Sequence, residues 1–251
     1  TDVNISGLRE IGGNGTADGN DVLTFDRSVT AGTRRLTGWN AVNLVNSSSL
    51  TADGNLVLAS GSVTIDSSST LFAGNAVNAI IETQGQSNAT LVNGGLIDLT
   101  NGDSGATDTL TVRGNYIGQN GTIKLQTVLA GDGAPSDRLI IDGGTVSGTT
   151  ALEVVNAGGL GAQTVGNGIE VVSGINGGRT TATTSGDGFT LVGQHVDAGA
   201  FEYRLYASDT TGSSESWFLR TQSGSVPSEV PTPTPSPTPT PAPAPIPPSL
   251  P

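Results

Sequence analysis

The sequence predicts an all-β protein, a right-handed parallel β-helix with a C-terminal antiparallel hairpin cap. Short apolar runs recur along the chain, and turns rich in Gly, Asn, Asp and Ser separate them. Runs of this length that contain β-branched residues are typical of strands. Aromatic residues make up only 4% of the composition. The chain is therefore suited to a narrow core of stacked Val, Ile and Leu rather than to a wide globular interior.

Residues 1–103 are predicted to form the first coils, because a short strand can bury its inward side chains only when successive coils stack. Leu56-Val57-Leu58 and Val63-Thr64-Ile65 should each point two residues inward and one outward. Gly54-Asn55 and Gly94-Gly95 are expected in turns that need positive φ. Coils of roughly 20–25 residues would give on the order of ten coils. The strand runs are VLTFD (22–26), AVNLVN (41–46), LVL (56–58), SVTID (62–66), STLF (69–72), AII (79–81), ATLVN (89–93) and LIDL (96–99).

Residues 104–221 continue this pattern in its most regular form. The interruption of helical apolar spacing by Gly argues against helices here as well as upstream. We predict strands around the following apolar runs: 110–112, 123–125, 139–141, 152–155 and 169–172.

The end of this segment is aromatic. Six of the ten aromatic residues lie between Phe189 and Phe218. Alternation in 201–206 and again in 217–220 predicts two antiparallel strands, joined by the turn SDTTGSSE. The last coil of a solenoid has one face without a neighbour, and large side chains can cover that face. We therefore predict a hairpin cap.

Residues 222–251 differ sharply in composition. Twelve of the thirteen prolines lie from Pro227 onward. Alternating proline cannot form strand ladders or an α-helix, and it favours an extended polyproline II spacer. The segment is therefore predicted to be a disordered linker.

Six ordered blocks carry a resemblance to a known family. Together with the proline-rich segment they resemble the C-terminal part of a pertactin-like autotransporter passenger, the autochaperone or junction region. The blocks are LTVRGNYIGQNGTIKL (110–125), SDRLIIDGG (136–144), TALEVVNAGG (150–159), GNGIEVV (166–172), GAFEYRLY (199–206) and ESWFLR (215–220).

The resemblance implies a non-enzymatic role at the surface of a Gram-negative bacterium. It implies passage through the periplasm, release outside the cell in some cases, and coil-by-coil templating of upstream folding during outer-membrane translocation. The implied partners are the protein's own C-terminal outer-membrane β-barrel and, in an adhesin or virulence factor, a host-cell or matrix receptor. The predicted folding core and cap residues are Leu110, Ile123, Leu139, Ile141, Leu152, Val154, Phe201, Tyr203, Trp217 and Phe218.

Bulk properties exclude several other classes. The formal net charge is −12, with 10 basic and 22 acidic residues, so we expect no nucleic-acid partner, because phosphate neutralisation needs clustered Lys and Arg. The chain has no Cys, which excludes disulfides. It contains no apolar stretch of about 18 residues, and its first residues do not resemble a signal peptide, so this segment is not expected to insert into a membrane.

Several motifs suggest chemistry, but each lacks a necessary partner. Gly102-Asp103-Ser104-Gly105 copies the tetrapeptide around a protease serine, yet the chain has one His, His195, and no other protease signature. His195 is expected on a surface loop, since without a second His or Cys nearby a zinc site is not favoured. Gly12 to Asp18 comes near a calcium-binding nonapeptide, but Ala17 stands where Asp is needed and the motif is not repeated. Arg113-Gly114-Asn115 falls one residue short of an integrin-type tripeptide.

Asp132, Asp137 and Asp142 could form a carboxylate site, because some β-helices degrade polysaccharides. Small residues surround them, so caps of turns are the favoured interpretation. The sequence thus predicts no catalytic residue, no cofactor and no metal. The alternatives are a β-helical polysaccharide-degrading enzyme, or a passive stem that carries an upstream protease or lipase module.

Overall fold

The computed structural model describes residues 11–17, 19–85 and 88–221. Within these ranges the regular structure consists of β-strands and one short 3-10 helix, η1 (Thr33–Arg35). This confirms the predicted all-β class. The described part of the chain contains no helix that is long and apolar enough to span a membrane. The predicted proline-rich linker, 222–251, and the first ten residues lie outside the described ranges.

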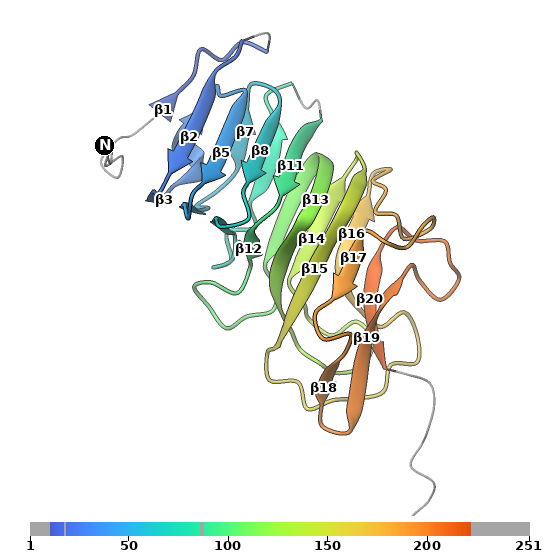
Figure 1. Ribbon diagram of the computed structural model, residues 1–251. Helices are drawn as coiled ribbons and strands as arrows, with labels where there is room; N and C mark the ends of the chain where they lie inside the picture. Colours follow the sequence, from blue (N-terminus) through green and yellow to red (C-terminus); the bar gives the residue numbers. More distant parts are fainter. Residues whose placement is uncertain (1–10, 18, 86–87, 222–251) are drawn as a thin grey trace, which may run out of the picture.

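The strands stack in parallel on three faces of one solenoid (Figure 1). The first face contains β1 (Ile11–Gly12), β4 (Leu36–Thr37), β7 (Leu56–Leu58), β10 (Ile80–Thr83), the start of β13 (Thr109–Thr127), β14 (Arg138–Asp142) and β16 (Ile169–Ile175). The second contains β2 (Val22–Asp26), β5 (Ala41–Val45), β8 (Ser62–Ile65), β11 (Ala89–Asn93), the middle of β13 and the first part of β15 (Val146–Asn156). The third contains β3 (Val29–Ala31), β6 (Ser49–Thr51), β9 (Thr70–Phe72), β12 (Leu96–Asp98), the later parts of β13 and β15, and β17 (Phe189–Leu191).

The core runs along the axis of this solenoid as columns of equivalent side chains. Val63 pairs with Val42 of the coil before it and with Leu91 of the coil after it, and all three side chains are fully buried. The residues between them alternate outward, as Thr64 does. The predicted inward pairs Leu56 and Leu58, and Val63 and Ile65, are buried in this way. Each added coil thus extends a continuous apolar column.

Coil length is not uniform, and here the prediction is wrong for the later coils. Hydrogen bonds that join neighbouring coils span 20 residues from Asp26 to Asn46, but 29 from Arg113 to Asp142 and 32 from Arg138 to Glu170. Longer coils give fewer rungs. In the described ranges, seven strands rather than about ten follow one another on the first face.

The predicted turn glycines are also corrected. Gly54-Asn55 and Gly94-Gly95 do not have positive φ. At Gly95 space is the constraint instead, because a Cβ there would lie 2.3 Å from the backbone oxygens of Asp66 and Ser69. Positive φ is taken at other turns by residues such as Asn46 and Ser47. Asn favours this conformation because its short polar side chain can bond locally.

In the C-terminal half, separate strands merge into one long strand that turns the corners of the coil. β13 pairs with β10 and β14 on the first face, and with β11, β12 and β15 on the other two. Its corners fall at Gly114, with φ 135°, and at Asn120, with φ 60°. β13 lies after the predicted boundary at 103/104 but pairs with strands from both sides of it, so both halves share one core. Their division into two domains stays a prediction.

Antiparallel strands close the C-terminal end, as predicted. β20 (Trp217–Thr221) pairs with β16 in antiparallel orientation, and β19 (Phe201–Ala207) pairs with β20. A third strand, β18 (Val196–Ala198), pairs with the far side of β19 and was not predicted. Figure 1 shows these three strands at the end of the stack opposite β1. We call β18, β19 and β20 the cap.

Candidate functional site

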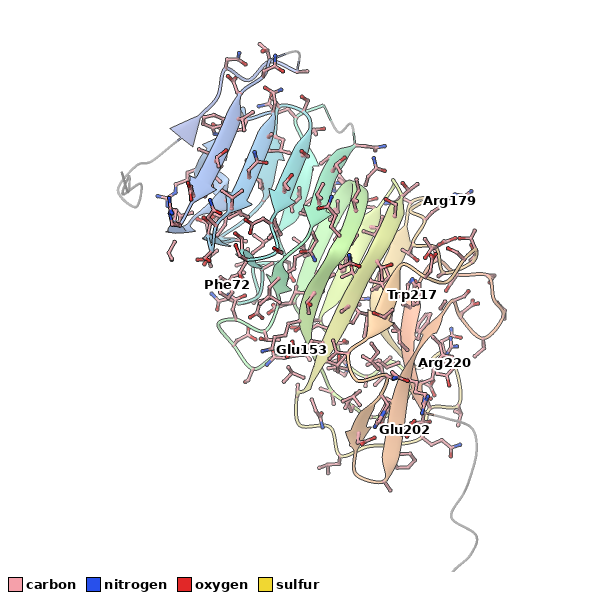
Figure 2. The ribbon with its side chains drawn as sticks, in the orientation of Figure 1. Phe72, Glu153, Arg179, Glu202, Trp217 and Arg220 are labelled. Carbon is pink, nitrogen blue, oxygen red and sulfur yellow. The ribbon has the colours of Figure 1, made fainter. Side chains whose placement is uncertain are left out.

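An aromatic column joins the cap to the coils. Phe189 stacks on Tyr116, with ring centroids 6.1 Å apart, and Trp217 meets Phe189 edge-on at 5.4 Å. These rings belong to β13, β17 and β20, and all three side chains are buried. Figure 2 shows Trp217 at the C-terminal end of the stack. The column fills the end of the core with bulk that Val, Ile and Leu cannot supply.

The buried indole N–H group of Trp217 has hydrogen-bond acceptors inside the protein. Its indole nitrogen lies 3.2 Å from the carbonyl oxygen of Thr180 and 3.1 Å from the hydroxyl of the same residue. Glu215 in turn accepts hydrogen bonds from the backbone and hydroxyl groups of Thr180. Because a buried indole N–H is costly without an acceptor, these contacts fix the position of the ring.

Tyr203 ties the cap to two loops. Its ring is fully buried, and its hydroxyl accepts a hydrogen bond from the Ala162 amide at 2.8 Å. The same hydroxyl lies within hydrogen-bond distance of the carbonyl oxygens of Ala130 and Ala162. The two alanines lie after β13 and after β15, so one side chain of β19 holds two successive coil connections.

A polar group crosses three coils inside the apolar core. Asn93 donates to the Tyr116 hydroxyl at 3.0 Å, and that hydroxyl lies 2.9 Å from the hydroxyl of Thr150. All three side chains are fully buried. Burial raises the pKa of Tyr116 to about 12, although the bonds to Thr150 and Asn93 act in the opposite direction. These three side chains can form their hydrogen bonds only when the coils are stacked in this register. The hydrogen bonds therefore specify the register of the coils.

Ion pairs connect successive coils on the outer surface of the same region. Arg113 lies between Glu82 of the coil before it and Asp142 of the coil after it. Hydrogen bonds to Asp142 and Glu82 raise the pKa of the Arg113 guanidinium. A second cross-coil ion pair joins Arg138 to Glu170 at 3.0 Å. Charge pairs of this kind penalise a shift in register more than they add to stability.

The predicted core and cap residues all lie in or against the central cluster of buried side chains, apart from Phe218. Val154 and Phe201 are partly buried and pack against that cluster. Phe218 is 8% exposed, and the guanidinium carbon of Arg220 lies over its ring, 5.3 Å from the ring centroid. The fully or almost fully buried members are Leu110, Ile123, Leu139, Ile141, Leu152, Tyr203 and Trp217.

The three aspartates considered as a carboxylate site have separate structural roles. Asp132 accepts bonds from the amides of Val165, Gly166 and Gly168, and although burial acts to raise its pKa, these bonds hold the pKa below its usual value. Asp137 is fully buried, and Asp142 pairs with Arg113.

Of the three aspartates, Asp137 has the pKa that is shifted most clearly. Its two carboxylate oxygens accept hydrogen bonds from the amides of Asp108 and Gln126, at 2.9 and 2.7 Å. Burial nevertheless raises its pKa to about 6. Burial also raises the pKa of Asp108, whose second carboxylate oxygen has no hydrogen-bond partner within the described residues. Asp108 and Asp137 directly precede β13 and β14, and their bonds to the amides of Ala76 and Asp108 join successive coils.

The remaining motifs are turns or surface groups. Asp103 accepts a hydrogen bond from the Gly105 amide, which closes the loop that contains exposed Ser104. Asn14, in the segment that comes near a calcium motif, accepts bonds from the amide and hydroxyl of Thr16. Asp18 of that motif lies outside the described residues. His195 directly precedes β18 and faces Asp197.

The predicted core and cap residues do not include Tyr116, Asn93 or Phe189, although Phe189 belongs to the aromatic group from which the cap is predicted. Tyr116 and Asn93 stand at inward positions of β13 and β11, where the two-residue alternation could have placed them. The pairing of Asn93 with Tyr116 and Thr150 depends on coil length, which varies and is not visible in the pattern.

The fold and its capped end define a β-helical stem of the type found in autotransporter passengers. Residues 86–205, just under half of the chain, match the family "Autochaperone Domain Type 1". The chain is an autotransporter passenger region that contains this autochaperone domain. The matched segment includes the Asn93, Tyr116 and Thr150 group and ends inside β19.

Curated relatives agree with this assignment. The chain is 34% identical over 183 residues to the Adhesin BmaC autotransporter of Brucella suis biovar 1 (strain 1330), covering 72% of the chain and 5% of that protein. It is 37% identical over 204 residues to the Probable autotransporter YfaL of Escherichia coli (strain K12), covering 77% and 15%. It is 36% identical over 116 residues to the Autotransporter adhesin AIDA-I of Escherichia coli, covering 45% and 8%. The chain thus spans only a small part of the length of these relatives.

Proposed function

We propose that residues 104–221 form the stable end of a passenger stem and nucleate the folding of the coils that precede them. The observation that carries this proposal is the aromatic column of Tyr116, Phe189 and Trp217, which fastens the antiparallel cap onto the last coils. Large, well-packed aromatic contacts raise local stability, and the most stable unit of a repeat structure is the place where folding begins.

The geometry of the coils supports a direction for this process. Every coil up to β16 pairs in parallel with its neighbour, so a folded coil offers an unpaired strand edge to the next one. The cap covers the C-terminal end with strands of opposite orientation. Growth therefore proceeds from the cap toward the N-terminus, and the cross-coil contacts of Tyr116 and Arg113 select the register.

We propose a non-enzymatic role at the bacterial surface for the complete protein. The names of its relatives suggest an adhesin, with an outer-membrane barrel as the partner that holds the stem and a host-cell or matrix receptor as the ligand class. The separate structural roles of Asp132, Asp137 and Asp142 support a stem over a polysaccharide-degrading enzyme.

Surface display of the natural autotransporter tests the proposal. Leu152→Asp places a charge in the core of β15, whereas the matched change Val192→Asp alters a side chain that is 50% exposed. We expect Leu152→Asp to reduce display and the protease-resistant stem, and Val192→Asp to leave both close to the parent level. Equal display and protease resistance in the two variants would contradict the proposal.

A further inference from the structure

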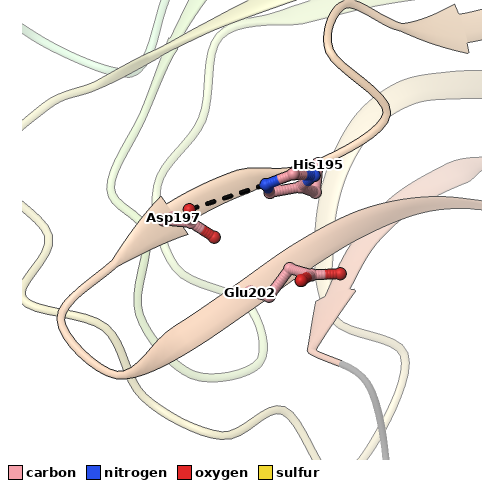
Figure 3. A group of neighbouring side chains, drawn as sticks. All are labelled: His195, Asp197 and Glu202. Carbon is pink, nitrogen blue, oxygen red and sulfur yellow. Dashed lines mark ion pairs between the residues drawn. The ribbon is translucent and has the colours of Figure 1, made fainter.

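Three metal-binding side chains come together on the outer surface of the cap. Asp197 of β18 and Glu202 of β19 are paired across the two antiparallel strands. His195 lies two residues before Asp197, on the same side of the strand. A ligand atom from each of these three residues lies within 4.8 Å of the other two, and the His195 Nε2 atom is 3.6 Å from an Asp197 carboxylate oxygen (Figure 3).

The alternation of the two strands places these groups in solvent. Tyr203 is fully buried and Val196 packs against the core, so the residues next to them in sequence face outward. His195 and Asp197 are exposed, and Glu202 is partly exposed. A metal ion can therefore reach the three side chains without any change in the backbone.

We propose that His195, Asp197 and Glu202 form a binding site for one Zn²⁺ ion. The sequence does not favour a zinc site at His195, because no second His or Cys lies nearby, but the structure brings two carboxylates to it instead. Zn²⁺ binds both imidazole nitrogen and carboxylate oxygen, and water completes the coordination at a site with three protein ligands. Ligands about 2.0–2.2 Å from a tetrahedral ion lie about 3.3 Å from one another. The His195–Asp197 distance is already close to this value, and rotation of the exposed side chains supplies the rest.

Arg204 sets the strength of the site. Its guanidinium donates a hydrogen bond to one carboxylate oxygen of Glu202, and the other oxygen of Glu202 is left for the ion. The positive charge of Arg204 opposes the binding of a cation, and its removal should strengthen binding. A bound ion would link β18 to β19 and so fasten the last strand pair of the cap.

Isothermal titration of the whole chain with zinc chloride tests this site, with magnesium chloride as the comparison. We expect one Zn²⁺ per chain and no comparable heat from Mg²⁺. His195→Ala and Glu202→Gln should each weaken binding on the order of tenfold or more. Arg204→Gln should strengthen it, and Asp187→Asn, at an exposed carboxylate in another loop, should leave it unchanged.

The proposal is overturned if the parent chain binds no Zn²⁺, or if His195→Ala binds as tightly as Asp187→Asn. Circular dichroism of each variant keeps the result interpretable, because these surface substitutions should not unfold the strands. The measurement is independent of the folding role proposed above, since it reads metal binding by the folded chain and not its display.

Discussion

The indole ring of Trp217 lies edge-on against the phenyl ring of Phe189, with the two planes at 75°. The two residues belong to different sheets of the solenoid, because Phe189 lies on the last rung of the third face and Trp217 pairs with the last strand of the first face. Their contact therefore closes the core between two faces at the end where the stack of coils stops.

Truncation of this contact should destabilise the C-terminal end. Trp217→Ala removes a buried ring and leaves a cavity, and we expect a loss of about 3–5 kcal/mol in the free energy of unfolding. Leu160→Ala, at a side chain that is 88% exposed, should change it by less than about 0.5 kcal/mol. Denaturant unfolding followed by circular dichroism measures both. Similar midpoints for the two variants would show that Trp217 does not hold the cap.

The buried polar group should be sensitive to the loss of a single hydroxyl. Tyr116→Phe keeps the ring but removes the partner of Asn93 and Thr150, and we expect a cost of about 1–3 kcal/mol. Tyr206→Phe is the matched control on the cap, where the ring lies against Arg220. Equal stability of the two variants in urea would argue that the polar group does not contribute to the alignment of the coils.

The corner of β13 should not accept a side chain. Gly114 has φ 135°, and a Cβ there would lie 2.1 Å from the backbone oxygen of Ala89 in the preceding coil. Gly114→Ala should therefore cost on the order of 3 kcal/mol. Gly131→Ala is the control, because a Cβ there would meet its nearest atom at 3.7 Å. Thermal unfolding compares the two, and a Gly114→Ala midpoint as high as that of the control would refute the corner constraint.

Stability should fall as the pH rises from about 4 to about 7. The pKa of Asp137 is raised to about 6 in the folded state, from 3.8 as the ordinary value. The folded state thus binds more protons than the unfolded state between these values, so the stabilisation is complete below the lower pKa and lost above the higher one. The negative charges of Asp108 and Asp103 also raise the pKa of Asp137. Asp137→Asn should flatten the dependence measured by denaturant unfolding.

Below about pH 4 the dependence should reverse, so that stability falls as the pH falls. Hydrogen bonds from the Ser213 amide and from neighbouring groups lower the pKa of Asp209 to about 2. The pKa of Asp66 is also lowered to about 2. Burial acts to raise this pKa, but hydrogen bonds from groups such as the Asn46 amide outweigh burial. Both carboxylates stabilise the fold when ionised and lose this effect as they are protonated. A stability profile without a maximum between these two regions would contradict the assignment.

The strand pattern could be predicted because it is local. The alternation in Leu56-Val57-Leu58 and in 201–206 follows directly from the two-residue period of a strand, and the hairpin turn follows from its Gly and Ser content. The cap could be predicted because aromatic residues are rare elsewhere in the chain. These elements need no knowledge of which coil lies next to which.

The contacts between coils could not be predicted in the same way. The distance in sequence between stacked positions grows from 20 residues at Asp26 and Asn46 to 32 at Arg138 and Glu170, so no fixed period places Asn93 beside Tyr116. The local sequence predicts positive φ at Gly94 and Gly95, but at Gly95 the structure needs space beside backbone oxygens instead. The coil spacing and the turn glycines were mispredicted for the same reason, because the close approach of one coil to another cannot be predicted from local sequence.

Native-state hydrogen exchange tests the central claim most directly, because it measures the free energy of opening at each amide. The account predicts that amides of β13, β14 and β20 exchange only when the whole chain unfolds, whereas those of β2 and β5 exchange through openings of lower free energy. Equal protection along the chain, or greater protection in β2 and β5, would contradict a folding nucleus at the capped end.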